Sequence, residues 1–118
     1  MAKNKALLPS MREKKRYIAF ELISDKPEIK AQSVQKAVLQ AVSAYLGKLG
    51  AAEAGVIMLK ERYDEKKNKG ILRCAHKYVD QVKAALAFRT EIDKAPVIFR
   101  TLGVSGIIKK AHAKYMSI

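Results

Sequence analysis

The chain has 118 residues, enough for one compact domain with a single hydrophobic core and too few for a second domain. Its single cysteine, Cys74, excludes an internal disulfide, and no apolar run approaches the roughly 18 to 20 residues of a membrane span. We therefore expect a soluble, cytoplasmic protein that does not enter a membrane, and the net charge of +13 predicts a polyanionic partner.

The positive charge is concentrated in three segments. Residues 1–16 carry six basic residues against one acid, residues 60–77 carry seven against three, and residues 100–118 carry four against none. The two remaining stretches are electrically balanced. A neutral body with concentrated basic segments is typical of a module that binds phosphates, because each phosphate neutralised by Lys or Arg releases a condensed counterion.

The first half of the chain predicts a strand followed by a helix. Residues 16–24 alternate, so that Ile18, Phe20 and Leu22 face one way, which is the pattern of a half-buried strand. Apolar residues then recur at intervals of three and four from residue 34 to residue 46. This periodicity predicts a helix that ends at Gly47.

The second half predicts a hairpin, a helix, a strand and a short final helix. Residues 54–62 and 70–75 read as strands joined by a charged loop, and helical periodicity returns over 77–91. A fourth strand is expected over 97–102. A turn at 103–106 then leads into a helix with Ser105 as its N-cap.

This order predicts an α+β fold of the β-α-β-β-α-β type, the split βαβ or ferredoxin-like sandwich that RRM domains share, with an added C-terminal helix. Both long helices would cover one face of a four-stranded antiparallel sheet and leave the other face open or partnered. We assign residues 1–15 to a basic N-terminal arm and residues 16–118 to a single RRM-like domain.

Two stretches of the sequence are similar to known nucleic-acid-binding motifs. The third strand has a Lys-Gly start at residues 69–70 but lacks the aromatic residues on which RRM domains stack bases, so contacts to phosphates and to RNA shape are expected instead. The Gly103-Val104-Ser105-Gly106 run matches a GxxG loop. Such a loop is either a purely structural turn or a turn that also contacts RNA or another partner through the helix that follows.

Catalytic and metal-binding chemistry is poorly supplied. His76 and His112 are the only histidines, Cys74 lies on the apolar face of a predicted strand, and no paired carboxylates or ligand spacings occur. We predict no catalytic site and no metal site on this chain.

Two stretches, residues 8–20 and residues 99–110, resemble archaeal ribonuclease P protein component 2, and residues 70–74 and 78–79 are similar to it as well. The similarity extends over about residues 7–115. One departure is Ile107, which stands where the family's Gly-Thr-Ile run has threonine.

This resemblance implies a function. Members of the family are subunits of the ribonucleoprotein that cuts the 5′ leader from precursor tRNA. The RNA subunit, with bound magnesium ions, is the catalyst, and the protein supports its catalytic domain without binding a cofactor itself. The family has the RRM-like fold and pairs with a TIM-barrel protein, ribonuclease P protein component 3, often with two copies of each.

We expect the N-terminal tract and the terminal helix to form one basic RNA-binding surface. The predicted contacts are Arg12, Lys14, Lys15, Arg16, Arg100, Gly103, Ser105, Gly106, Lys109, Lys110 and Lys114. Two alternatives stay open at this point. One is a general phosphate-reading RNA-binding module such as a ribosomal accessory protein, and the other is a ferredoxin-like protein-interaction domain whose charges only keep it soluble.

Overall fold

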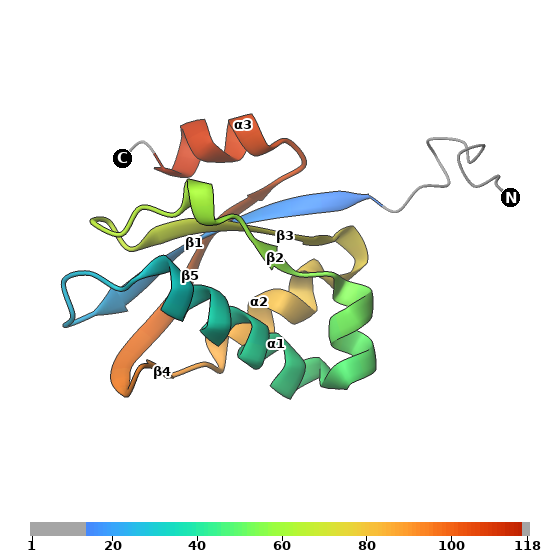
Figure 1. The fold of residues 1–118 in the computed structure, drawn as a ribbon. Helices are drawn as coiled ribbons and strands as arrows, with labels where there is room; N and C mark the ends of the chain where they lie inside the picture. The colour runs from blue at the N-terminus through green and yellow to red at the C-terminus, as the bar shows by residue number, and fades with distance from the viewer. Residues whose placement is uncertain (1–13, 117–118) are drawn as a thin grey trace, which may run out of the picture.

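The computed structural model describes residues 14–116, which form an antiparallel sheet with helices on both of its faces (Figure 1). The strands are β1 (Lys15–Ser24), β2 (Ile57–Met58), β3 (Lys69–Ala75), β4 (Glu91–Ile92) and β5 (Ala95–Ser105), in the order β2-β3-β1-β5-β4. The helices are α1 (Ala31–Ala54), α2 (Val79–Ala87) and α3 (Ile108–Ala111), and two 3-10 turns cover Lys60–Arg62 and His76–Tyr78. The predicted α+β class and split βαβ order are confirmed, and β4 is an additional edge strand.

The last helix continues from α3 into a π-helical turn, His112–Met116, and we call Ile108–Met116 the C-terminal helix. None of the helices within residues 14–116 is both long and apolar enough to cross a membrane. Of the predicted N-terminal arm, only Lys14 and Lys15 belong to the described residues, and Arg12 lies outside them.

One face of the sheet, which we call the inner face, packs against α1 and α2. Ile18, Phe20 and Leu22 point into this core, as the alternation in the sequence predicts. The ring centroids of Phe20 and Phe99 lie 5.7 Å apart at its centre. Twenty buried residues form this cluster, so most of the apolar surface that folding removes from water lies on this side.

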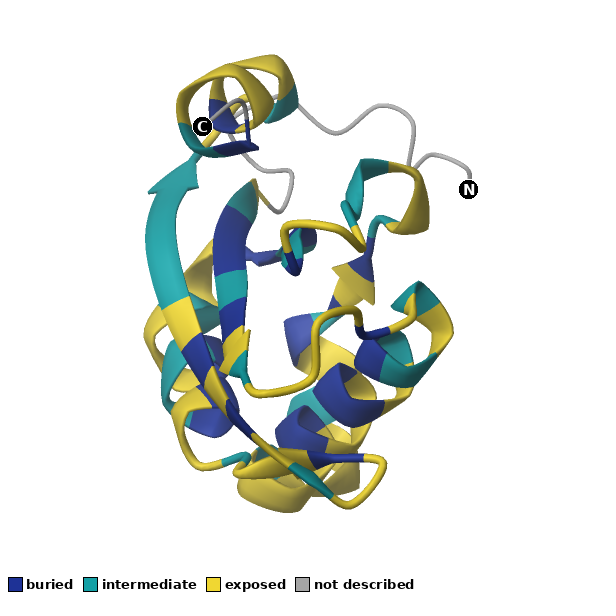
Figure 2. Ribbon diagram, turned by 90° about the vertical axis from the view of Figure 1, so that its left-hand side faces the viewer, coloured by how far each residue is buried: buried dark blue, intermediate teal, exposed yellow. Residues whose placement is uncertain are grey.

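The opposite, outer face is covered in its middle by the C-terminal helix. Ala19 of β1 and Ile71 of β3 are buried beneath Ala111 and Met116. The outward surface of the helix stays largely exposed (Figure 2). The face that was expected to be open or partnered is therefore partly closed by the chain's own last segment.

The prediction for residues 47–62 is wrong in part. Gly47 does leave the helical conformation (φ 77°, ψ 173°), but the chain then resumes the helix to Ala54 because the residues that follow are mostly strong helix formers. Gly55, at φ 57°, ends it by donating its N–H to the Ala51 carbonyl over 3.2 Å. Only Ile57–Met58 of the predicted second strand pairs with β3.

The boundaries around the last strand also differ from prediction. The second helix stops at Ala87, because Asp93 and Lys94 (φ 52° and 68°) form a tight turn that folds β4 back onto the start of β5. β5 then runs to Ser105 rather than to residue 102. Within β5 a bulge at Leu102 shifts the register against β1, so Ala19 pairs with Gly103 and Phe20 with Thr101.

Candidate nucleic-acid interface

The basic tract at the start of β1 lies between the ends of two neighbouring strands. Because β1 is antiparallel to both β3 and β5, its first residues meet the last residues of each (Figure 1). Lys15 pairs with Ala75, and the His76 N–H donates to the Lys14 carbonyl over 2.9 Å. Tyr17 pairs with Ser105 on the other side. Residues 14–16 are thereby fixed beside the turn that begins the C-terminal helix.

That turn contains Ser105, Gly106 and Ile107. The Ile107 N–H donates to the Ser105 hydroxyl over 3.1 Å, so Ser105 shapes the turn, and the predicted N-cap role is wrong because Ile107 itself occupies the N-cap position. A Cβ atom on Gly106 would lie 3.6 Å from Nη1 of Arg16. Arg16 therefore lies beside Gly106, and the N-terminal tract is next to the start of the C-terminal helix.

Gly103 has a different role from the one that the GxxG pattern predicts. It lies inside β5, paired with Ala19, so the predicted turn begins two residues too early. A Cβ atom there would overlap the ring and hydroxyl of Tyr115, which lies directly over it. The glycine is needed because the C-terminal helix packs closely on the strand at this point.

The lysines of the C-terminal helix lie on its exposed side. Lys109 and Lys110 are in the first turn, next to Gly106, while Ala111 faces the sheet. Lys114 lies toward the other end, with its ammonium 5.5 Å from the centroid of the Tyr115 ring. At that end, Nζ of Lys67 donates to the Met116 carbonyl over 3.4 Å.

Arg100 lies apart from this group. Its Nη1 is 3.5 Å from Oε1 of Glu21, which it faces across β1 and β5. Five residues of strand, about 16 Å, separate Arg100 from Ser105. We define the basic pole as the part of the predicted surface that the structure gathers at one end of the sheet: Lys14, Lys15, Arg16, Ser105, Gly106, Lys109 and Lys110.

Sequence reasoning missed His76 and Lys77. Both are exposed and directly follow β3, where the bond from His76 to the Lys14 carbonyl places them beside the pole. The signal was present, since a hairpin strand that pairs with β1 must end beside the start of β1. Glu53, which accepts a hydrogen bond from the Tyr78 hydroxyl, lies near Lys77 and marks the limit of the basic surface.

The described residues offer little for acid–base or metal chemistry. Burial raises the pKa of the Cys74 thiol to about 11. The pKa of the Tyr63 hydroxyl is also raised well above its usual range, mainly by burial and in addition by the negative charges of Glu65 and Asp64. Within residues 14–116, no three His, Cys, Asp or Glu side chains lie close enough together to hold a metal ion. The arrangement at the pole is suited to holding phosphates, which is a binding task.

Comparison with known proteins gives consistent matches to one family. The sequence model of the Rpp14/Pop5 family matches residues 16–116. The chain is 44% identical over 115 residues to ribonuclease P protein component 2 of Thermococcus kodakarensis, covering 98% of this chain and 93% of the relative. The protein of the same name from Methanocaldococcus jannaschii is 42% identical over 114 residues, covering 97% and 81%.

Among solved structures, a chain in the cryo-EM structure of yeast ribonuclease MRP superimposes with a TM-score of 0.62. The match covers 80% of this chain and 76% of the yeast one, at 14% sequence identity. At that identity the similarity concerns the fold.

Proposed function

This chain belongs to the Rpp14/Pop5 family and is a protein subunit of ribonuclease P, and on that premise we propose that it holds the RNA subunit through its basic pole. The observation that supports this role most directly is the position of Arg16 beside Gly106, where two basic segments about ninety residues apart in sequence meet. Together the two segments present several positive charges on one surface, where they can neutralise neighbouring phosphates.

In this proposal the protein screens repulsion between phosphates and leaves the chemistry to the RNA. Lys15, Arg16, Lys109 and Lys110 neutralise backbone phosphates of the catalytic RNA domain, which lets RNA helices and the precursor-tRNA leader approach each other. In this proposal the magnesium ions belong to the RNA active site, as the resemblance to the family implies, and this chain contributes positive charge around that site. The chain then acts as a binding and positioning subunit.

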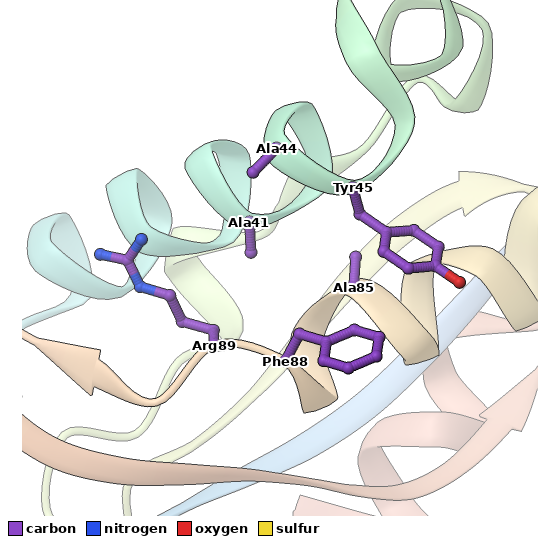
Figure 3. Close-up of a pocket in the computed structure, with 6 residues that line it drawn as sticks. All are labelled: Ala41, Ala44, Tyr45, Ala85, Phe88 and Arg89. Carbon is purple, nitrogen blue, oxygen red and sulfur yellow. The ribbon is translucent and has the colours of Figure 1, made fainter.

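The protein partner is proposed to dock on the side of α1 and α2. Large apolar side chains are exposed there on both helices, at Leu39, Tyr45, Leu49 and Phe88. The Tyr45 and Phe88 rings stack with centroids 5.6 Å apart and, with Arg89, line a shallow pocket between the helices (Figure 3). Exposed apolar patches of this kind mark protein interfaces. We propose ribonuclease P protein component 3 as the occupant, in a complex with two copies of each protein.

The decisive experiment compares two variants that lose the same charge from different sides. One replaces Lys15, Arg16, Lys109 and Lys110 with alanine, and the control replaces the exposed Lys26, Lys30, Lys36 and Lys48. We expect the first to weaken binding to ribonuclease P RNA about a hundredfold and to lower the slope of log affinity against log salt by roughly 3, with a matching loss of precursor-tRNA cleavage in the reconstituted particle. The control should change the affinity by about twofold or less.

Equal losses from both variants would show that only net charge matters and would contradict the basic pole as the RNA-binding surface. Sequencing of RNA that co-purifies with the full chain gives an independent check. Ribonuclease P RNA is the expected species, whereas ribosomal RNA would favour a general RNA-binding module.

A further inference from the structure

The outer face of the sheet contains an arginine with unsatisfied hydrogen-bonding capacity. Nε of Arg73 is fully shielded from solvent and has no hydrogen-bond partner among residues 14–116, and its guanidinium makes no ion pair with a carboxylate of that range. A desolvated donor on a charged group costs free energy unless an acceptor satisfies it. Because Arg73 as a whole is only partly buried, the rest of its guanidinium stays within reach of a ligand, and the missing acceptor for Nε can be supplied when a ligand binds and the side chain adjusts.

Arg73 has apolar neighbours on both sides. It is directly opposite Tyr17 in β1 and Ile57 in β2, and residues opposite each other share one face of the sheet. Tyr17 is half-buried, whereas Ile57 exposes 46% of its surface. The three side chains thus form a short row across the central strands, with a cation in the middle.

This row lies between the C-terminal helix and the basic pole. On one side, the next outward-facing pair is Ala19 and Ile71, which the helix covers. On the other side, the next pair is Lys15 and Ala75, at the start of the pole. Tyr17 packs against the outer cluster beneath the helix, so the row lies at the edge of the helix, where RNA bound at the pole would meet it.

The chemistry of the row distinguishes between forms of RNA. A duplex presents its phosphates but keeps its bases stacked inside, so its bases cannot pack on apolar side chains of the sheet. An unpaired nucleotide offers both a phosphate for the guanidinium and a base face that packs on an arginine plane, a tyrosine ring or an aliphatic side chain. We propose that Tyr17, Ile57 and Arg73 form a subsite for one unpaired nucleotide of RNA, with Lys15 beside it. This subsite rests on the proposed function, because the ligand is taken to be RNA.

Binding of full-length protein to a labelled short oligouridylate and to an RNA duplex of equal length tests the subsite. Arg73→Lys keeps the charge but removes Nε and the planar guanidinium, and we expect it to lower affinity for the single strand about tenfold. Ile57→Thr, on the exposed flank, should lower it about threefold. Duplex affinity should change by no more than about twofold in either variant, since the phosphate-neutralising charges remain.

Arg100→Lys, at an exposed position of β5 away from the subsite, makes the same exchange and should leave both affinities unchanged. Unchanged melting temperatures would exclude a folding defect. Photo-crosslinking with a 4-thiouridine oligonucleotide should label the β1 or β3 peptide. Labelling confined to the C-terminal helix would contradict the subsite.

Other results overturn the proposal in distinguishable ways. If Arg73→Lys lowers the affinity for single strand and duplex equally, Arg73 is a general phosphate contact. If it lowers neither affinity, Arg73 is a structural residue. Displacement of the oligonucleotide by polyglutamate from the parent but not from Arg73→Lys would identify a site for acidic protein segments. If Arg73→Lys behaves as expected while the four-residue alanine variant still binds ribonuclease P RNA normally, the subsite stands and the proposed role of the pole fails.

Discussion

The two faces of the sheet differ both in how much protein covers them and in the charge of that covering. The cluster between the inner face and α1 and α2 contains twenty buried residues, whereas the cluster between the outer face and the C-terminal helix contains four. α1 and α2 carry three lysines and two acids, while the C-terminal helix carries three lysines and no acid. The inner side stabilises the fold, and the outer side presents charge on a lightly held segment.

The largest effect that tests this contrast is on stability. Phe20→Ala empties the centre of the inner core and should cost about 3–5 kcal/mol. Met116→Ala removes a buried side chain from the outer cluster but should cost at most about 2 kcal/mol, because the C-terminal helix can detach locally before the sheet unfolds. Urea denaturation of both variants measures the difference. Equal costs would show that the outer cluster unfolds only together with the rest.

A second effect, of at most about 2 kcal/mol because the helix can detach to relieve the strain, concerns how the C-terminal helix sits on β5. Gly103→Ala places a Cβ atom inside the Tyr115 ring, so the helix must move away from the strand. Faster hydrogen exchange in residues 108–116 should accompany the loss of stability.

The double variant Gly103→Ala with Tyr115→Ala removes the overlap and should be more stable than the sum of the single variants predicts. Strict additivity in this cycle would mean that the close approach of Tyr115 is not the reason for the glycine.

Local patterns in the sequence were sufficient for the inner half of the fold. The alternation of Ile18, Phe20 and Leu22 gives the core face of β1, and the helical period from residue 34 onward gives α1. Residues 47–62 were assigned incorrectly because Gly47 is both a reasonable stop and, in this chain, a kink between two helical segments. The helix-forming residues that follow Gly47 favour the kink over the stop.

The site was predictable in composition but not in geometry. Net charge identifies Lys14–Arg16 and Lys109–Lys110 as candidates, yet only the antiparallel register of β1 with β3 and β5 brings them together. Gly103 was read as part of a binding loop because Tyr115, which requires it, is twelve residues away in sequence. Arg73 was not predicted as a site residue, because the burial of its Nε without a hydrogen-bond partner is a property of the folded sheet and cannot be read from the sequence.

An effect of similar size, on the order of 2 kcal/mol, appears at alkaline pH and belongs to the inner face. Burial raises the pKa of Cys74 from its ordinary 9.0 to about 11 in the folded state, so between these values the unfolded chain releases the thiol proton while the folded chain keeps it. Stability therefore falls as pH rises through this window. Cys74→Ala should flatten the decline in a pH series of urea denaturations, and an unchanged slope would show that other groups cause it.

The smallest expected effect is that of replacing Arg100, which lies on the outer side of the sheet but outside the basic pole. Arg100 is 63% exposed and paired with Glu21, so Arg100→Gln should cost no more than about 0.5 kcal/mol of stability. Because Glu21 already offsets its charge, and because the pole lies about 16 Å farther along the strand, RNA affinity should change by less than about twofold. Arg16→Gln removes the same charge beside Gly106 and should weaken RNA binding several-fold. A comparable loss of RNA affinity from Arg100→Gln in the same titration would mean that RNA extends along β5 over the exposed end of the outer face. RNA binding would then be a property of the whole outer face and not of the basic pole alone.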